Sequence, residues 1–257
     1  KNRASMAAAY SELGHEATGE VVAMGDNVTA VRVGDVVPAL ALPAYREYFV
    51  AAADKVIKLP HGVEPNLALG EAIACCVHAS WRFNVQKGDK VAIYQGADFV
   101  CAVDPVAERR EMSKVYGAHV AYAPTEMSGA ELLVKHGEFD VVIEAAGVQS
   151  AIDLATELVC QHGRIVLVGY HQSNQGQRTV NMQQWNFKAI DVVNGHVRRQ
   201  AEKVAAMAEG MKLLAEGHLQ TEPLVTLYPF EQIEAAFQAL DQGEAGLFKA
   251  VLVADSQ

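Results

Sequence analysis

The sequence predicts an α/β protein in which a β-rich front part precedes a doubly wound parallel sheet. Before residue 60, short Val-rich runs alternate with small or polar residues and are broken by turn pairs such as Gly25-Asp26 and Gly34-Asp35. From residue 91 to 193, strand-like apolar runs alternate with helical stretches, which is typical of parallel strands joined by crossover helices. The 257 residues are 51% hydrophobic, enough to bury a sizeable core.

The front part is predicted to consist of short strands and turns between residues 13 and 60. Its last two strands are expected over residues 45–50 and 55–60, where apolar and polar residues alternate. The run over residues 65–80 is rich in Ala and is more helical than extended.

The parallel sheet and the tail follow in a regular order. A helix is expected to begin at residue 107, after the second strand of the sheet, and a long helix at residue 201. The sheet strands are predicted at residues 91–94, 100–104, 141–144, 164–169 and 190–193, and the tail adds a helix over 231–240 and a strand over 249–253.

Charge and composition exclude several function classes. The formal net charge of −10 argues against non-specific nucleic-acid binding. The sequence contains no run of about 18 uncharged apolar residues, so no membrane span is predicted. The four cysteines fit neither a disulfide framework nor a four-cysteine zinc lobe, which predicts a reducing, cytoplasmic setting.

Two short motifs carry candidate metal ligands. In Gly14-His15-Glu16, a neutral imidazole can bind Zn²⁺, and the adjacent carboxylate can bind the metal or orient a ligand. Glu71 falls in the first turn of the predicted helix, where it would also complement the helix dipole. Ordinary structural roles are the alternative for all three. Cys75 and Cys76 are interpreted as small buried residues.

Residues 13–22, with Gly25 and residues 33–37, resemble the start of the GroES-like catalytic domain of zinc-dependent medium-chain dehydrogenases/reductases, the alcohol and polyol dehydrogenase superfamily. The resemblance covers nearly the whole chain, because residues 140–147 and 222–252 also match. It implies a GroES-like domain over 1–80 without its N-terminal part, a Rossmann domain over 81–197 and a return segment over 198–257.

The resemblance also implies a zinc site. His15 would bind the catalytic zinc, Glu16 would be an exchanging ligand or a neighbouring carboxylate, and Glu71 would supply the ligand of the polyol dehydrogenase form. Another ligand is normally a Cys in the family, and no Cys precedes His15. Residues 38–44 contain no Cys where the family's structural zinc would need four, so one catalytic zinc and no structural zinc are expected.

The cofactor site departs from the usual pattern. A dinucleotide fold places Gly-x-Gly-x-x-Gly after its first strand and an acidic residue about 20 residues later. Here only Gly96 is present, and Asp104 follows eight residues after it. Either the chain lacks the loop and first helix, or a segment is absent from the sequence as given. The second explanation is favoured because parallel strands need a longer connection.

The remaining cofactor contacts are implied by the resemblance. Asp104 would hold the ribose hydroxyls and favour NAD over NADP, although a turn Asp would look the same. Val168 and Gly169 would meet the nicotinamide, and His171 beyond them would lie near it or be an exposed loop residue. Lys249 would approach the pyrophosphate, or be an exposed strand charge.

These residues together predict a zinc-dependent oxidoreductase that transfers hydride between an alcohol or polyol and NAD(H). The expected partners are a small alcohol or carbonyl substrate and further copies of the chain, in a homodimer or homotetramer. A zinc-independent quinone or enone reductase of the same fold, or a non-catalytic relative that binds a cofactor or partner, are the alternatives.

Overall fold

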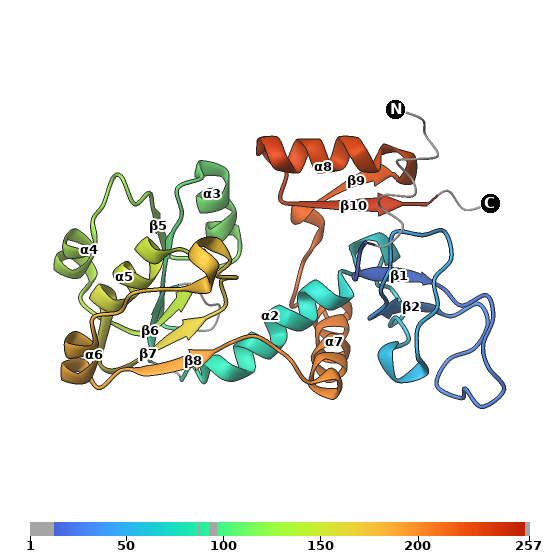
Figure 1. Ribbon diagram of the computed structural model, residues 1–257, viewed down its shortest axis with the longest axis horizontal. Helices are drawn as coiled ribbons and strands as arrows, with labels where there is room; N and C mark the ends of the chain where they lie inside the picture. Colours follow the sequence, from blue (N-terminus) through green and yellow to red (C-terminus); the bar gives the residue numbers. More distant parts are fainter. Residues whose placement is uncertain (1–12, 87, 93–96, 255–257) are drawn as a thin grey trace. The chain divides into compact units, whose positions relative to one another are not determined.

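A computed structural model describes residues 13–86, 88–92 and 97–254, which divide between two compact units (Figure 1). Unit 1 comprises residues 1–78 and 197–257, and unit 2 comprises residues 79–196. The boundary falls inside helix α2 (Gly70–Phe83). Over the described residues, every helix is too short or too polar to cross a membrane.

The front of unit 1 contains less strand than predicted. Strand β1 (Ala17–Glu20) pairs antiparallel with β2 (Val36–Ala39), and a single bridge joins Ala39 to Val56. The strand predicted over 45–50 is wrong, since this segment bends. The Ala44 and Tyr45 amides instead donate to the carbonyl of Leu13, which ties the segment to the chain just before β1. Two short 3₁₀ helices follow, η1 (Ala53–Lys55) and η2 (Pro65–Leu67).

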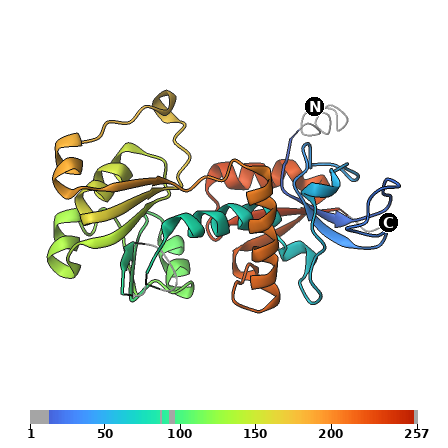
Figure 2. The ribbon, with the colours of Figure 1, turned by 90° about the horizontal axis from the view of Figure 1, so that it is seen from below.

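The core of unit 1 lies between two helices that come from opposite ends of the chain. Helix α7 (Gln200–Ala215) runs beside α2 (Figure 2). Met207 and Met211 of α7 are completely buried and pack with Ile73 and Val77 of α2. The predicted helix over 65–80 is thereby confirmed, beginning five residues later at Gly70.

The tail of unit 1 contains a parallel strand pair. Strands β9 (Val225–Pro229) and β10 (Lys249–Val253) pair from Val225 opposite Lys249, and the bounds of β10 match the prediction. Helix α8 (Ile233–Gln242) connects them. The short 3₁₀ helices are η4 (Glu222–Leu224) and η5 (Phe230–Gln232).

Unit 2 is built on a six-stranded parallel sheet in the order β5-β4-β3-β6-β7-β8. Counted within the sheet, this order is 3-2-1-4-5-6, that of a doubly wound dinucleotide-binding fold. The predicted parallel sheet is therefore confirmed. The strands are β3 (Lys90–Ala92), β4 (Phe99–Val103), β5 (Val120–Tyr122), β6 (Phe139–Glu144), β7 (Val159–Leu167) and β8 (Asp191–Asn194).

Helices cover both faces of this sheet. Val142 of β6 packs into one core with Leu132 and Leu158, whereas its neighbours in β6 pack into a second core with Phe83. Alternate side chains of a strand point to opposite faces, so both faces are buried. The helices are α3 (Ala107–Val115), α4 (Gly129–His136), α5 (Gln149–Leu158), α6 (Met182–Lys188) and the short η3 (Ser173–Gly176).

The connection between β3 and β4 is unusually short. The two strands are parallel neighbours, with Lys90 opposite Phe99, yet only residues 93–98 separate them in the chain. A crossover between parallel strands usually needs about a dozen residues. Six residues leave no room for the helix that normally follows the first strand of this fold.

Candidate metal centre

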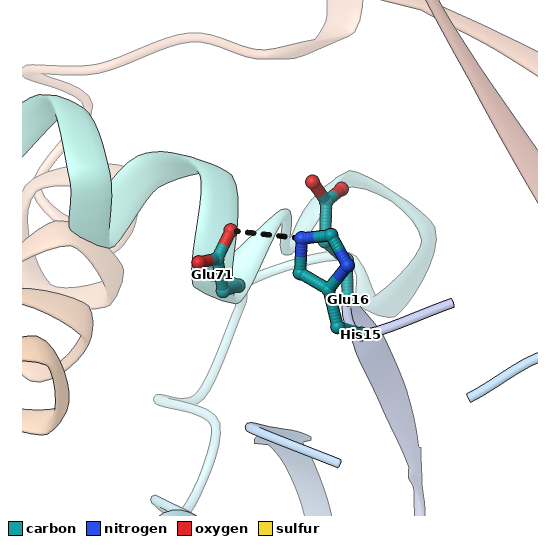
Figure 3. A group of neighbouring side chains, drawn as sticks. All are labelled: His15, Glu16 and Glu71. Carbon is teal, nitrogen blue, oxygen red and sulfur yellow. Dashed lines mark ion pairs between the residues drawn. The ribbon is translucent and has the colours of Figure 1, made fainter. Parts of the chain in front are cut away.

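Three predicted ligands of unit 1 lie together in a group that we call the ligand cluster: His15, Glu16 and Glu71 (Figure 3). One ligand atom of each lies within 4.8 Å of the others, and His15 Nε2 is 3.8 Å from Glu71 Oε2. His15 and Glu16 immediately precede β1, whereas Glu71 is the second residue of α2. The fold thus brings together side chains that are more than 50 residues apart in the sequence.

Gly14 sets the direction of the chain into the cluster. Its φ of +83° lies in the left-handed region, and a Cβ there would come within 2.9 Å of the Tyr45 ring and 3.0 Å of the Tyr45 amide nitrogen. A side chain at this position would therefore be strained and would push against Tyr45. The glycine that begins the predicted motif is required by the backbone that carries His15.

Gly70 plays a similar part for the third ligand. A Cβ on Gly70 would lie 2.6 Å from the Cβ of Pro38 in β2 and 3.0 Å from Met207 Sδ. The first turn of α2 can approach β2 only because no side chain is present there. Glu71 is consequently 8% exposed, although it is charged.

Each carboxylate of the cluster has a lysine partner. Lys203 Nζ of α7 lies 2.5 Å from Glu71 Oε1, and Lys249 of β10 donates to Glu16 Oε2. Sequence analysis left Lys249 either near the cofactor pyrophosphate or as an exposed strand charge, and in the structure its ammonium pairs with Glu16 of the ligand cluster. Sequence analysis missed Lys203, because nothing in its local sequence connects it with a residue 132 positions away.

Glu71 is held in its ionised form. Burial alone would raise the pKa of Glu71, but the hydrogen bond and charge of Lys203 outweigh it and lower the pKa below its ordinary value. Cys75, one turn later, donates to Glu71 Oε1 at 3.4 Å. Burial first, and the charge of Glu71 second, raise the pKa of Cys75 to about 12, so it remains a thiol donor at neutral pH.

Cys76, the second cysteine of α2, is not buried as sequence analysis predicted. Cys76 is exposed, so the expectation that it is a small buried residue is wrong. In α2 the buried stripe follows Ile73, Ala74 and Val77, and position 76 lies beyond the edge of this stripe.

The cluster fits a zinc ion by donor chemistry and by spacing. Imidazole nitrogen and carboxylate oxygen bind zinc at about 2.0–2.2 Å, so small side-chain rotations bring donors less than 5 Å apart onto one ion. A dication bound by the two carboxylates would take the place of Lys203 and Lys249 as their positive partner. Within the described part of the chain, no other group of three potential ligands lies this close together.

The cluster opens into a cavity of about 390 Å³ in unit 1. His15 and Glu71 lie on its wall together with aliphatic and basic side chains. A small molecule in this cavity would therefore contact the candidate metal site directly.

At the carboxyl ends of the unit 2 strands, which we call the carboxyl edge, predicted cofactor residues make backbone contacts. Asp104 directly follows β4, and its Oδ1 accepts from the Val106 amide at 2.8 Å. This is the local turn bond proposed as the alternative, and it engages only Oδ1 of the carboxylate. Gly96 lies outside the described residues.

Val168 and Gly169 follow β7, and both amides donate to the carbonyl of Glu144 at the end of β6. A Cβ on Gly169 would lie 2.3 Å from the Gly147 amide nitrogen and 2.6 Å from Glu144 Oε2. Backbone therefore packs directly on backbone where the family resemblance places the nicotinamide.

Glu144 and His171 form a polar pair that sequence analysis did not identify. Glu144 is 2% exposed, its Oε1 accepts from the Ala146 and Gly147 amides, and its Oε2 lies 2.9 Å from His171 Nε2. His171 Nδ1 accepts from Arg178 Nε, which can only donate, so the neutral ring carries its proton on Nε2. Nε2 and Glu144 Oε2 are both buried and close together, but their geometry is not that of a hydrogen bond. His171 therefore supports the loop rather than being an exposed loop residue.

Comparison with known proteins supports this description. A family model described as zinc-binding dehydrogenase matches residues 90–215. L-threonine 3-dehydrogenase of Francisella tularensis is 23% identical over 91% of this chain and 80% of its own length. Sorbitol dehydrogenase of Halalkalibacterium halodurans is 24% identical over 93% of this chain and 82% of its own. The crystal structure of 2R,3R-butanediol dehydrogenase from Bacillus subtilis is 22% identical with a TM-score of 0.80, covering 95% of this chain and 80% of that one.

Proposed function

Because the chain belongs to the zinc-type medium-chain dehydrogenases/reductases, a family of NAD(P)-dependent oxidoreductases, we propose that it transfers hydride between an alcohol or polyol and NAD(H). The single observation that carries the proposal is the ligand cluster. Its three donors are brought together where Gly14 takes a left-handed φ of +83° and Gly70 allows α2 to approach β2 closely.

The residues of unit 1 would hold one catalytic zinc through His15 and Glu71, with Glu16 as an exchanging ligand or a neighbouring carboxylate. Zinc at such a site acts as a Lewis acid that lowers the pKa of a substrate hydroxyl. Lys203 keeps Glu71 ionised and therefore able to bind a metal at neutral pH. No second, structural zinc is proposed, since residues 38–44 contain no Cys.

The residues of unit 2 would hold the dinucleotide, whose nicotinamide accepts or donates the hydride. Asp104 would bind the ribose hydroxyls and disfavour a 2′-phosphate, which supports NAD over NADP. The backbone at Val168 and Gly169 would face the nicotinamide.

Elemental analysis of the purified protein, combined with NAD-dependent oxidation of a panel of alcohols and polyols, tests this proposal. We expect about one zinc per chain, and we expect His15→Ala and Glu71→Ala to lose zinc and at least about 100-fold of the activity. His218→Ala is the matched control, because His218 is exposed and lies 3.9 Å from Glu216 outside the cluster.

Protein that stays free of zinc when zinc is supplied would contradict the proposal. Activity on enones or quinones without zinc would then favour a reductase of the same fold. Zinc binding with no turnover of any alcohol would favour a non-catalytic relative.

A further inference from the structure

We propose that the substrate is a small hydroxy acid, whose carboxylate is bound by Arg198 and Lys55 while its hydroxyl lies at the ligand cluster. The inference rests on the proposed function, because it takes the ligand cluster as the place of the reacting hydroxyl. It adds the carboxylate of the substrate, whereas the ligand cluster determines only where the reacting hydroxyl lies.

The cavity beside the cluster is lined by side chains of two chemical kinds. The apolar residues come from the end of β2, the segment before η1 and the segment that leads into α7. The polar residues come from the ligand cluster, from η1 and from α7 with the segment before it. The apolar lining comprises Leu40, Ala41, Leu42, Val50, Ala51, Ala52 and Val197, and the polar lining comprises His15, Lys55, Glu71, Arg198, Gln200 and Lys203.

The polar side chains that line the cavity carry an excess of positive charge. Lys203 is neutralised by Glu71, the one acidic side chain of the lining. Over the described residues, neither Lys55 nor Arg198 has a side-chain hydrogen bond or an ion-pair partner. Asp54 precedes Lys55 but lines a separate hollow. Two uncompensated cations thus line one cavity in a chain whose net charge is −10.

This charge favours an anionic oxygen group over a neutral polyol. A guanidinium presents a fork of donors that matches a carboxylate, and a lysine adds a compact positive charge. Hydroxyl groups alone would be satisfied by neutral polar side chains such as Gln200. The first turn of α7 also favours an anion. Its first residue, Gln200, lines the cavity, and its N-cap Arg199 makes no side-chain capping bond, so backbone N–H groups of this turn lack a side-chain acceptor.

The size of the cavity limits the acid. A volume of about 390 Å³ lies near the lower end of the range for ligand sites. More than half of the lining residues are apolar, among them Leu40 and Leu42. A short-chain hydroxy acid has fewer hydroxyl groups to place beside such side chains than a long polyol has.

Paired substrates test the proposal. The compounds 3-hydroxybutyrate and 1,3-butanediol share a secondary hydroxyl on the same carbon chain, and lactate and 1,2-propanediol form a second pair. For at least one pair, we expect kcat/KM to be about tenfold or more higher for the acid. Arg198→Met and Lys55→Met should each raise KM for the acid about tenfold and leave KM for the diol unchanged.

Two controls separate the possible results. Arg199→Met should change neither KM, because Arg199 is exposed, pairs with Glu202 and does not line the cavity. The zinc content and NADH affinity of Arg198→Met should equal those of the unchanged protein.

Equal use of acids and diols by the zinc-loaded protein would overturn this inference and leave the proposed function standing. Loss of NADH affinity in Arg198→Met would also overturn it, since the cation would then serve the cofactor. Absence of zinc and of all alcohol oxidation would instead be a failure of the proposed function itself.

Discussion

The ligand cluster of unit 1 and the carboxyl edge of unit 2 use their acidic residues in opposite ways. In the cluster, Glu16 and Glu71 are paired with lysine ammonium groups, which can yield to a metal ion. At the carboxyl edge, Glu144 and Asp104 accept backbone amides. A carboxylate oxygen that accepts a backbone amide loses that bond if it turns to a ligand, so Asp104 can accept a ligand hydroxyl at Oδ2 while Oδ1 keeps the Val106 amide.

This difference indicates how the two regions are built. In unit 1, the functional groups are side chains that Gly14 and Gly70 allow to come together. In unit 2, the functional surface is backbone, and buried side chains such as Glu144 hold it in place. We therefore expect substitutions at the carboxyl edge to affect folding first, and substitutions in the cluster to affect metal binding first.

The largest effect is expected for Gly169→Ala. The new Cβ would lie 2.3 Å from the Gly147 nitrogen, and backbone cannot move aside as a flexible side chain can. We expect unit 2 to lose about 3 kcal/mol of unfolding free energy, measured by urea denaturation. Gly25→Ala is the control, because a Cβ there meets nothing closer than 4.0 Å. A loss of zinc affinity at unchanged stability would contradict the distinction between the two regions.

A second effect compares two glycines of unit 1. Gly14 and Gly34 have similar φ values of +83° and +89°, but only Gly14 has a neighbour, Tyr45, that a Cβ would strike. Both alanine variants should lose about 1 kcal/mol to backbone strain. Gly14→Ala should lose about 1 kcal/mol more and bind zinc at least tenfold more weakly in a chelator competition. Equal zinc affinity in the two variants would mean that Gly14 does not position His15.

A third effect concerns the cofactor alone. Asp104→Asn keeps an oxygen for the Val106 amide but removes the negative charge. We expect NADH to bind about tenfold more weakly, NADPH to bind no more weakly than before, and zinc affinity to stay the same. Fluorescence titration with both cofactors measures this. An unchanged NADH affinity would leave Asp104 as a turn residue only.

Much of this arrangement follows from local sequence. The alternation of strands and helices predicts the parallel sheet, and Gly14-His15-Glu16 with Glu71 predicts the ligand cluster. The sheet rests on short-range signals, namely strand and helix periodicity and turn residues, whereas the choice of His15, Glu16 and Glu71 as ligands rests on the family resemblance of these motifs. The segment 45–50 was not predictable in this way, because its amides bond to Leu13, about 30 residues earlier.

The partners of the predicted residues could not be derived from the sequence. Lys203 meets Glu71 only because α7 packs on α2 through Met207 and Met211. Lys249 pairs with Glu16, 233 residues earlier in the chain, and nothing in the sequence of its strand indicates this partner. Long-range ion pairs depend on how helices and strands pack together. The periodicity of one helix or strand does not indicate which other elements will lie beside it.

The smallest effect separates two acidic residues outside both regions. The pKa of Asp35 in unit 1 is lowered chiefly by its hydrogen bond with Lys58, and that of Glu131 in unit 2 by hydrogen bonds with Ser128. Because both pKa values are lower in the folded state, each contribution is present above about pH 4 and is lost as the pH falls through the folded value. We expect Lys58→Met and Ser128→Ala each to lower the urea midpoint slightly at pH 7, and the difference from the unchanged protein to shrink as the pH falls below 4. Only the effect of Lys58→Met should weaken in 1 M salt, since a charge pair is screened and a capping hydrogen bond is not. Equal salt sensitivity in the two variants would show that the charge of Lys58 contributes no more to Asp35 than a neutral donor would.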